Sequence, residues 1–246
     1  AGAHVEAAME TAGEEGALPG LAGTVRISAP EGFSERILVP AMPTFVTQYP
    51  GMCIELVATS GYLSPTTREV DIAITASKPG SPRLMIEKLT DFELGLYGSP
   101  AYLKKKGTPQ STDDLKNFDF IGYVDDLLYT QDIKFLDAVQ PKLRRWLTCS
   151  SLRLQVLLAE KGGGLGAFPR FMADDSNLVP LLPDINVTRS YWTAVHSDLN
   201  ETTRIRAVRR WLKELVNENR LRLIPSLKGS KSRVINRSSR GAVRRS

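Results

Sequence analysis

The spacing of apolar residues switches between two periods along the chain. Residues 23–30 alternate apolar and polar positions, which predicts a strand. Residues 34–50 repeat apolar side chains every three or four positions, which predicts an amphipathic helix. Ser34 is the expected N-cap and Pro50 ends the helix, while a second proline at Pro40 predicts an irregular turn before the regular part.

The rest of the chain continues this alternation. Further strands of the first part are predicted over residues 52–58, 71–75, 84–89 and 92–98. With the intervening helical turns, this gives a β-α-β-α-β order, typical of a parallel sheet with crossover helices. A second module of strands and helices follows to about residue 195, and a last helix over 201–217 has no sheet of its own. The pattern therefore predicts an α/β fold of two modules.

A glycine-rich stretch, "AEKGGGLGAFP" at residues 159–169, resembles a phosphate loop. Gly162, Gly164 and Ala167 satisfy the spacing G-x-G-x-x-A. A dinucleotide site needs these glycines after a strand and before a helix, whereas here a predicted helix over 151–161 precedes them and a strand follows. Gly162 instead fits the left-handed position that ends a helix. No Lys-Ser/Thr pair follows the glycines, which excludes a P-loop.

Charge is concentrated at one end of the chain. The net charge is +5, but residues 229–246 carry six basic residues and no acidic one, so the remainder has a net charge of −1. This distribution predicts a disordered basic tail, either a solvated extension or a weak nucleic-acid contact, on a nearly neutral body. No apolar run reaches the roughly 18 residues of a membrane helix.

The chemistry of catalysis and metal binding is poorly represented. The chain has two histidines, His4 and His196, and two cysteines, Cys53 and Cys149, without the spacing of a triad, a zinc site or a disulfide framework. Both cysteines lie in strand-like surroundings and are predicted to be buried thiols. We therefore expect neither an enzyme nor a cofactor.

Five segments, in order, resemble the effector-binding part of LysR-type transcriptional regulators. The most specific is "YGSPAYLKKKGTPQSTDDLKNFDFIGY", and together the five cover roughly residues 23–224. The other four are "GTVRISAPEGFSERILVPAMPTFVTQYPGMCIEL", "VDIAI", "LAEKGGGLGAFP" and "TRIRAVRRWLKELV". The resemblance implies an α/β fold like that of type 2 periplasmic binding proteins, in which two α/β subdomains are crossed twice by the chain and enclose a ligand cleft.

The resemblance also implies a division of the chain. Its crossings should fall near 97–99 and 195–197. The expected parts are residues 1–22 as the remnant of a linker helix and linker, 23–97 with 197–228 as subdomain I, 98–196 as subdomain II and 229–246 as the tail. We expect DNA contact only through an N-terminal helix-turn-helix outside this segment, a cytoplasmic location and no membrane contact. An extracytoplasmic solute-binding protein of the same fold is the alternative.

An effector site is expected in the cleft, because ligands of open α/β sheets bind beyond the carboxyl ends of the strands. Helix N-termini at 34, 99 and 151 could receive an anion. The residues that leave the strand ends are Pro30, Glu31, Gly32, Phe33, Thr59, Ser60, Thr75, Tyr123, Ser150, Ser151 and Phe168.

The chemistry of the effector follows from the resemblance less directly. Regulators of this family commonly bind small organic acids. Many of them have Ser or Thr where this chain has Gly32, and Glu31 adds a negative charge, so a neutral or amine-bearing effector is the alternative. Simple N-capping is the alternative role of the serines and threonines.

The resemblance further implies a homodimer, and a tetramer of the full-length regulator. Two effector domains would pair side by side and antiparallel, the helix after the first strand of one subunit meeting helix 151–161 of the other. Val39, Met42, Val46 and Leu157 are the expected contacts.

Overall fold

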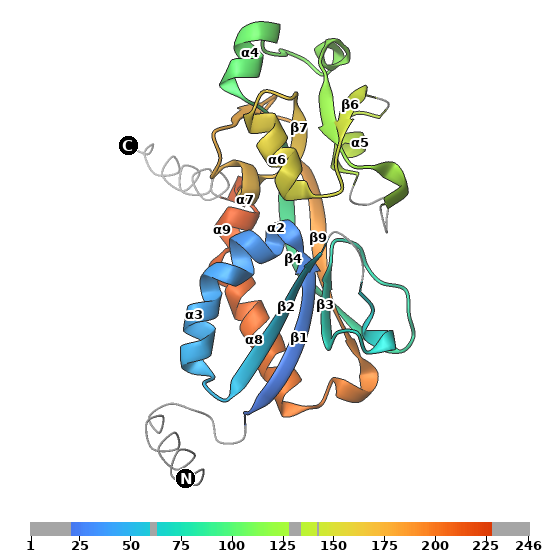
Figure 1. Cartoon of the computed structure of the whole chain (residues 1–246), viewed down its shortest axis with the longest axis vertical. Helices are drawn as coiled ribbons and strands as arrows, with labels where there is room; N and C mark the ends of the chain where they lie inside the picture. Colours follow the sequence, from blue (N-terminus) through green and yellow to red (C-terminus); the bar gives the residue numbers. More distant parts are fainter. Residues whose placement is uncertain (1–20, 60–62, 128–133, 142, 228–246) are drawn as a thin grey trace, which may run out of the picture.

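The computed structural model describes residues 21–59, 63–127, 134–141 and 143–227. These form two lobes, one above the other in Figure 1. We call the described residues of 23–88 and 192–227 lobe I, and those of 90–190 lobe II. The dividing point is a β-bulge between Lys88 and Thr90, where the pairing of two long strands shifts register.

One seven-stranded sheet runs through both lobes in the order β2-β1-β3-β9-β4-β7, with β8 also paired to β4. The strands are β1 (Gly23–Pro30), β2 (Met52–Thr59), β3 (Ile72–Thr75), β4 (Leu84–Gly98), β7 (Gly166–Pro169), β8 (Val179–Leu181) and β9 (Val187–His196). β1 is parallel to β2 and β3, while β9 is antiparallel to β3 and β4. Two further strands, β5 (Phe120–Gly122) and β6 (Arg145–Thr148), form a separate parallel pair in lobe II.

The two strands expected over 84–89 and 92–98 are a single strand, β4. The polar residues Thr90 and Asp91 break the alternation, but the bulge absorbs the change of register and the strand continues. Asp91 is held at this point by Lys88 at 2.7 Å and by the Ser190 hydroxyl at 2.6 Å. The interruption in the pattern therefore marks a bulge and not a turn.

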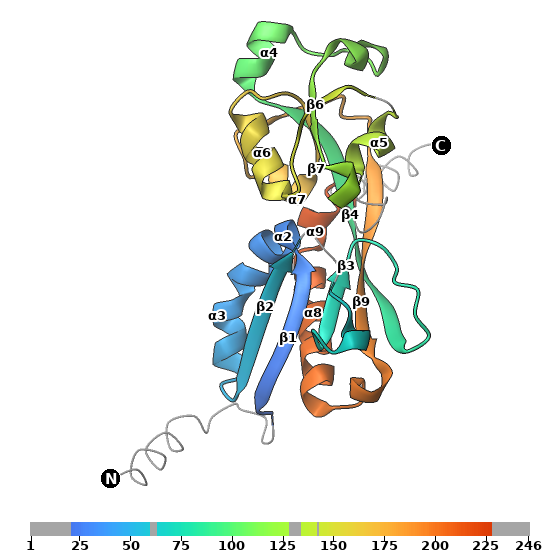
Figure 2. The ribbon, with the colours of Figure 1, turned by 45° about the vertical axis from the view of Figure 1, so that its right-hand side comes forward.

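The chain passes between the lobes inside β4 and β9, which run from one lobe into the other in Figures 1 and 2. The start of β4 pairs with the end of β9 in lobe I, while the end of β4 pairs with β7 and β8 in lobe II. Both strands therefore extend across the bulge, and the crossings expected near their ends, at 97–99 and 195–197, stay a prediction.

The helical segment after β1 begins at Glu31, three residues before the predicted start. It consists of α2 (Glu31–Phe33), a π-helical turn η1 (Ser34–Leu38) and α3 (Val39–Gln48), and it follows Pro30, which has φ −55°. Ser34 is therefore an interior residue and not the N-cap. Pro40 has no N–H to donate to the Arg36 carbonyl, which instead accepts a hydrogen bond from Arg222 Nη1 at 2.9 Å.

The last long helix, α8 (Thr203–Glu218), packs on lobe I, close to the predicted 201–217. Its apolar stripe is buried, and Trp211 meets the ring of Phe45 from α3 at 4.7 Å between centroids. A short helix, α9 (Arg220–Leu223), follows and contacts lobe II through α7 (Arg170–Ala173). The C-terminal segment thus packs against both lobes.

Lobe II is built from shorter pieces. Its helices are α4 (Pro100–Lys106), α5 (Phe135–Val139), α6 (Leu152–Glu160) and α7. The glycine run connects α6 to β7, and Gly162 has φ +83°, as predicted for the end of a helix. A Cβ at Gly164 would lie 2.7 Å from the Asp119 carbonyl, so the run allows close backbone packing. The stretch does not have the strand-then-helix order of a dinucleotide site.

An aromatic cluster joins the lobes at the crossing strands. Phe92 of β4 stacks on Tyr191 of β9 at 4.2 Å between centroids. Phe33 from lobe I lies against Tyr191 at 4.8 Å, and Phe171 from lobe II lies 6.2 Å from Phe92. One continuous hydrophobic core therefore runs through both lobes.

Candidate functional site

The N-terminal turn of α2 in lobe I meets the N-terminus of α6 in lobe II (Figure 1). The carboxylate of Glu31 accepts a hydrogen bond from the Ser151 hydroxyl, with distances of 2.8 and 3.1 Å to its two oxygens. It also accepts the Arg153 backbone N–H at 3.3 Å. The Ser151 hydroxyl in turn caps α6, because it accepts the Leu154 N–H at 3.2 Å. These contacts join residues 120 positions apart into one polar junction, which we call the lobe junction.

The first turn of a helix has backbone N–H groups without partners inside the helix, and its dipole favours negative charge. The Glu31 carboxylate occupies this position at α6. Of the three helix N-termini expected to receive an anion, those at 99 and 151 exist, with Ser99 and Ser151 as side-chain caps. The one expected at 34 does not, since the helix starts at 31.

Two residues that follow Glu31, Gly32 in α2 and Ser34 in η1, are closely packed. A Cβ at Gly32 would overlap Met172 Sδ of α7, so glycine allows α2 to approach lobe II. The Ser34 side chain is 2% exposed, and its hydroxyl has no hydrogen-bond partner among the described residues. A hydroxyl-bearing side chain at position 32 could not be accommodated without moving Met172.

Ion pairs reinforce the contact on either side. Arg153 of α6 lies 3.5 Å from Glu35, which joins lobe II to lobe I a second time. Asp175 after α7 pairs with Arg222 and lies 3.8 Å from Arg36. These side chains are partly exposed, so each pair contributes modestly, in the range of about 0–1 kcal/mol.

The residues predicted from strand ends divide into two groups. Glu31, Gly32 and Ser151 meet at the junction, with Pro30 half-buried and Ser150 exposed beside them. The other described residues of the set lie elsewhere. Buried positions are occupied by Phe33, Thr75, Tyr123 and Phe168. Thr75 donates its hydroxyl to the Ser77 carbonyl at 2.7 Å, Thr59 ends β2, and Ser60 lies outside the described residues. The role of this set in binding an effector stays a prediction.

A small pocket lies in lobe II at the end of β5. It is lined by Tyr123, Lys134, Phe135, Arg145 and Gln155, among others, and has about 10 Å³ of space, which is room for roughly one water molecule. Lys134 and Arg145 both pair with Asp125, at 3.1 and 2.9 Å. The pairing lowers the pKa of Asp125, chiefly through the hydrogen bond from Lys134.

The sequence did not single out Arg153, Gln155 or Met172 as parts of this region. The sequence does contain a signal for Arg153, because the second residue after an N-cap has a free backbone N–H at the start of the helix. A signal for Glu31 is also present: Pro30 is a suitable residue before a helix, and an acidic side chain is favoured in the first helical turn. The approach of Met172 to Gly32 depends on lobe packing and has no local signal.

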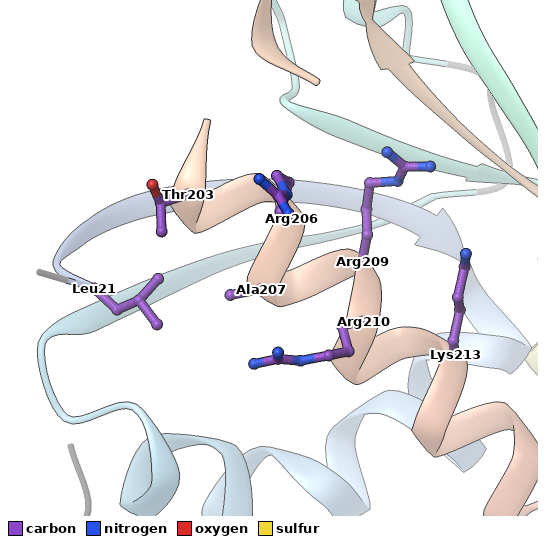
Figure 3. Close-up of a pocket in the computed structure, with 7 residues that line it drawn as sticks. All are labelled: Leu21, Thr203, Arg206, Ala207, Arg209, Arg210 and Lys213. Carbon is purple, nitrogen blue, oxygen red and sulfur yellow. The ribbon is translucent and has the colours of Figure 1, made fainter. Parts of the chain in front are cut away.

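A wider groove, of about 510 Å³, lies along the outer face of α8 (Figure 3). Its cationic side chains are Arg206, Arg209, Arg210 and Lys213. Glu87 pairs with two of them, at 2.9 Å from Arg209 and 2.7 Å from Lys213, and the hydrogen bond from Lys213 is the main cause of the lowered pKa of Glu87. The groove belongs to lobe I alone, so a ligand there would not contact both lobes.

The two cysteines are free thiols in the structure. Cys53 is exposed, contrary to the prediction of burial, because it lies on the outer face of β2, and Cys149 is half-buried. The described part of the chain brings no three His, Cys, Asp or Glu side chains into a group that could hold a metal ion. None of the helices in the described ranges combines the length and apolar character that crossing a bilayer requires.

Comparisons with known proteins agree with this architecture. The family model of the LysR substrate binding domain matches residues 19–217. The HTH-type transcriptional regulator CrgA of Neisseria meningitidis serogroup C (strain 8013) is 27% identical over 204 residues, which are 80% of this chain and 68% of that regulator. For CrgA of serogroup B (strain MC58), identity is 28% over 74% of this chain and 64% of the regulator. The chain thus spans about two thirds of the length of these relatives.

Solved structures show the same relationship. The regulatory domain of CrgA, a LysR-type transcriptional regulator, superposes with a TM-score of 0.71 and 26% identity, covering 78% of this chain and 98% of that one. The effector domain of AmpR from Pseudomonas aeruginosa has a TM-score of 0.66 at 20% identity, which supports the fold. These relatives are transcriptional regulators and not enzymes, and they favour a regulator over a solute-binding protein. This chain therefore belongs to the LysR substrate-binding domain family, the effector-binding part of LysR-type transcriptional regulators.

Proposed function

We propose that this domain senses a small molecule at the lobe junction. One observation carries the proposal: helix starts from both lobes, α2 and α6, meet at a polar contact made by Glu31, Ser151 and Arg153. A ligand that enters there contacts both lobes, so its binding energy can change their relative position. The predicted division into two subdomains and the set of strand-end residues are part of this proposal.

The proposed output is a change in DNA contacts made by a helix-turn-helix domain outside this segment, in the cytoplasm. The near-neutral body, with a net charge of −1 before residue 229, offers little phosphate-binding excess of its own. The effector follows the family in being small; organic acids are the class that the family commonly binds, and a neutral or amine-bearing effector is the alternative that Glu31 favours.

We also propose a homodimer through α3 and α6. Val39 and Val46 of α3 are 52% and 57% exposed, and Leu154 of α6 is 50% exposed, so both helices present apolar side chains to solvent. Met42 and Leu157, the other expected contacts, are half-buried. An isologous antiparallel pairing would cover both helices at once. Light scattering at micromolar concentration should give the mass of a dimer, and Val46→Asp should shift it to that of a monomer.

Effector binding is tested by a thermal-shift screen of small carboxylates, amines and neutral aromatic compounds. Any compound that stabilises the protein should lose its effect in Ser151→Trp, because the indole would fill the junction. Ser111→Trp, an exposed serine of lobe II, is the matched control and should keep the effect. Compounds that stabilise both variants equally would place the ligand site elsewhere.

A further inference from the structure

The position at the α6 N-terminus that suits an anion is taken by a side chain of the protein itself. From this we infer that Glu31 is a specificity-determining residue: it is a built-in competitor for the anionic group of a ligand and causes the lobe junction to reject small carboxylates. The inference rests on the proposed function, because it concerns which ligands the same junction accepts.

Three hydrogen-bond donors at this end of α6 are already used. The Ser151 hydroxyl donates to Glu31, and the Arg153 N–H does the same. The Leu154 N–H is used by Ser151 as the cap. A carboxylate ligand would therefore find these donors occupied and a negative charge beside it, and it could bind only by displacing Glu31.

The helical segment that carries Glu31 also holds a polar group without a described partner. Ser34 lies three residues after Glu31, at the start of the π-helical turn η1. The Ser34 hydroxyl is almost completely buried and lacks a partner among the described residues. A buried hydroxyl without a partner carries a desolvation cost that a ligand could relieve. A neutral or amine-bearing ligand could lie beside Glu31 without displacing it, whereas a carboxylate would meet a like charge.

The local electrostatics support the same selection. Arg153 donates its backbone N–H to Glu31, but its guanidinium lies 3.5 Å from Glu35. Arg36, from the same helical segment, lies 3.4 Å from Glu35 and 3.8 Å from Asp175. The guanidinium groups of Arg153 and Arg36 are therefore both paired with other carboxylates, which leaves Glu31 to determine the charge that a ligand meets at the junction.

Glu31→Ala tests the inference, with acetate as the probe. Removing the carboxylate should lower the thermal midpoint by roughly 2–5 °C, since a hydrogen bond to a charged group is lost in a chain of this size. Sodium acetate should restore part of this loss, with half-saturation on the order of 10 mM, while sodium chloride at equal ionic strength should not. The unchanged protein should show no difference between the two salts.

A second measurement and a matched control make the result specific. In a nitrogen-15 NMR titration, acetate should shift the Arg153 and Leu154 amides of Glu31→Ala and leave those of the unchanged protein in place. Glu35→Ala removes another carboxylate that contacts α6 only through the Arg153 side chain, so it should gain no acetate response. If Glu31→Ala does not fold, Glu31→Gln is used in its place. Acetate should displace its neutral amide from the α6 N-terminus, but at a higher concentration than Glu31→Ala requires.

An acetate response in the unchanged protein as large as in Glu31→Ala would overturn the inference, and so would no acetate-specific response in either Glu31 variant. The Ser151→Trp screen distinguishes this from failure of the proposed function. If that screen places the effector at the junction while the Glu31 variants ignore acetate, only the present inference falls. If the Glu31 variants bind acetate but the effectors bind elsewhere, Glu31 still excludes carboxylates from the lobe junction. In that case the proposed function is wrong, because the junction is not the effector site.

Discussion

Lobe I and lobe II differ in the length of the elements from which they are built. In lobe I, β1 and β2 have eight residues each and α8 has sixteen. In lobe II, β5 has three residues, β6 and β7 have four, and α6, with nine, is the longest described helix. A long helix or strand has a continuous apolar face that it can bury against the core. A short one has few such residues and depends on packing with side chains from distant parts of the chain. The lobe junction therefore joins a lobe with regular elements to one held together by tertiary contacts.

The largest effect should come from the core of lobe I. Phe45→Ala removes a ring that contacts both Tyr49 and Trp211, and should lower the free energy of unfolding by about 3–5 kcal/mol. Val46→Ala, the next residue and 57% exposed, should change it by less than about 0.5 kcal/mol in the monomeric state. Urea unfolding monitored by circular dichroism measures both. Equal effects of the two substitutions would mean that α3 does not pack as described.

A smaller effect is expected in lobe II, on α6. Val156→Ala truncates a fully buried side chain and should cost about 2 kcal/mol. The neighbouring Leu157 was expected at the dimer contact and is only half-buried, so Leu157→Ala should cost less in stability despite removing more atoms. Urea unfolding of the two variants gives the order directly. A larger loss for Leu157→Ala would indicate that α6 is rotated relative to lobe II.

The pH dependence of lobe II should depend on Tyr97. Its hydroxyl donates to Asp174 at 2.6 Å, and burial, with the nearby Asp174 carboxylate, raises the pKa of Tyr97 above its ordinary value. A raised pKa favours the neutral form in the folded state, so this stabilisation is present below about pH 10 and is lost as the pH rises further.

Tyr97→Phe removes both the hydrogen bond and the titration. At neutral pH it should cost about 1 kcal/mol, because Asp174 is exposed and water can replace the lost donor. Above pH 10 the stability of the unchanged protein should fall toward that of the variant by up to about 1.4 kcal/mol per pH unit. Parallel stability curves for the two proteins between pH 9 and 11 would contradict this account.

The smallest effect, and one of opposite sign, is expected at Ser34 in the π-helical turn η1. Ser34→Ala removes a buried hydroxyl without a described partner, and should raise the free energy of unfolding by up to about 1 kcal/mol. Thr75→Val removes a buried hydroxyl that does have a partner, the Ser77 carbonyl, and should lower it by about 1 kcal/mol. Thermal unfolding of both variants measures the contrast. A loss of stability in Ser34→Ala equal to that in Thr75→Val would show that Ser34 is already hydrogen-bonded.

The difference between the lobes also explains how much of the fold the sequence predicts. The apolar stripe of α8, from Ile205 to Val216, is complete within one segment, and its predicted bounds were nearly correct. The alternation in β1 was equally informative. The continuity of β4 was missed, because only the pairing with β9 shows that Thr90 lies at a bulge and not in a turn. Contacts between distant segments leave no local pattern.

The site was predictable to a similar degree. The helix start expected at 151 is present, with Ser151 as its cap, and the carboxyl end of β1 leads to the lobe junction, whereas effector binding there stays a prediction. To predict that Glu31 contacts α6, one must know that the helical segment after β1 begins at residue 31. Pro30 indicates this start, but the apolar pattern of later residues favoured a start at 34. Phe33, expected on a wall of the cleft, belongs to the aromatic cluster with Tyr191 that joins the lobes.

The most direct test of the central claim is a nitrogen-15 NMR titration of this chain with each stabilising compound from the screen. If the effector binds at the lobe junction, the largest amide shifts should fall on residues 31–34 and 151–154, together with the crossing strands near Tyr191. Residues 206–213 along the α8 groove should shift little. Shifts concentrated in the α8 groove, with none at the start of α6, would contradict the account.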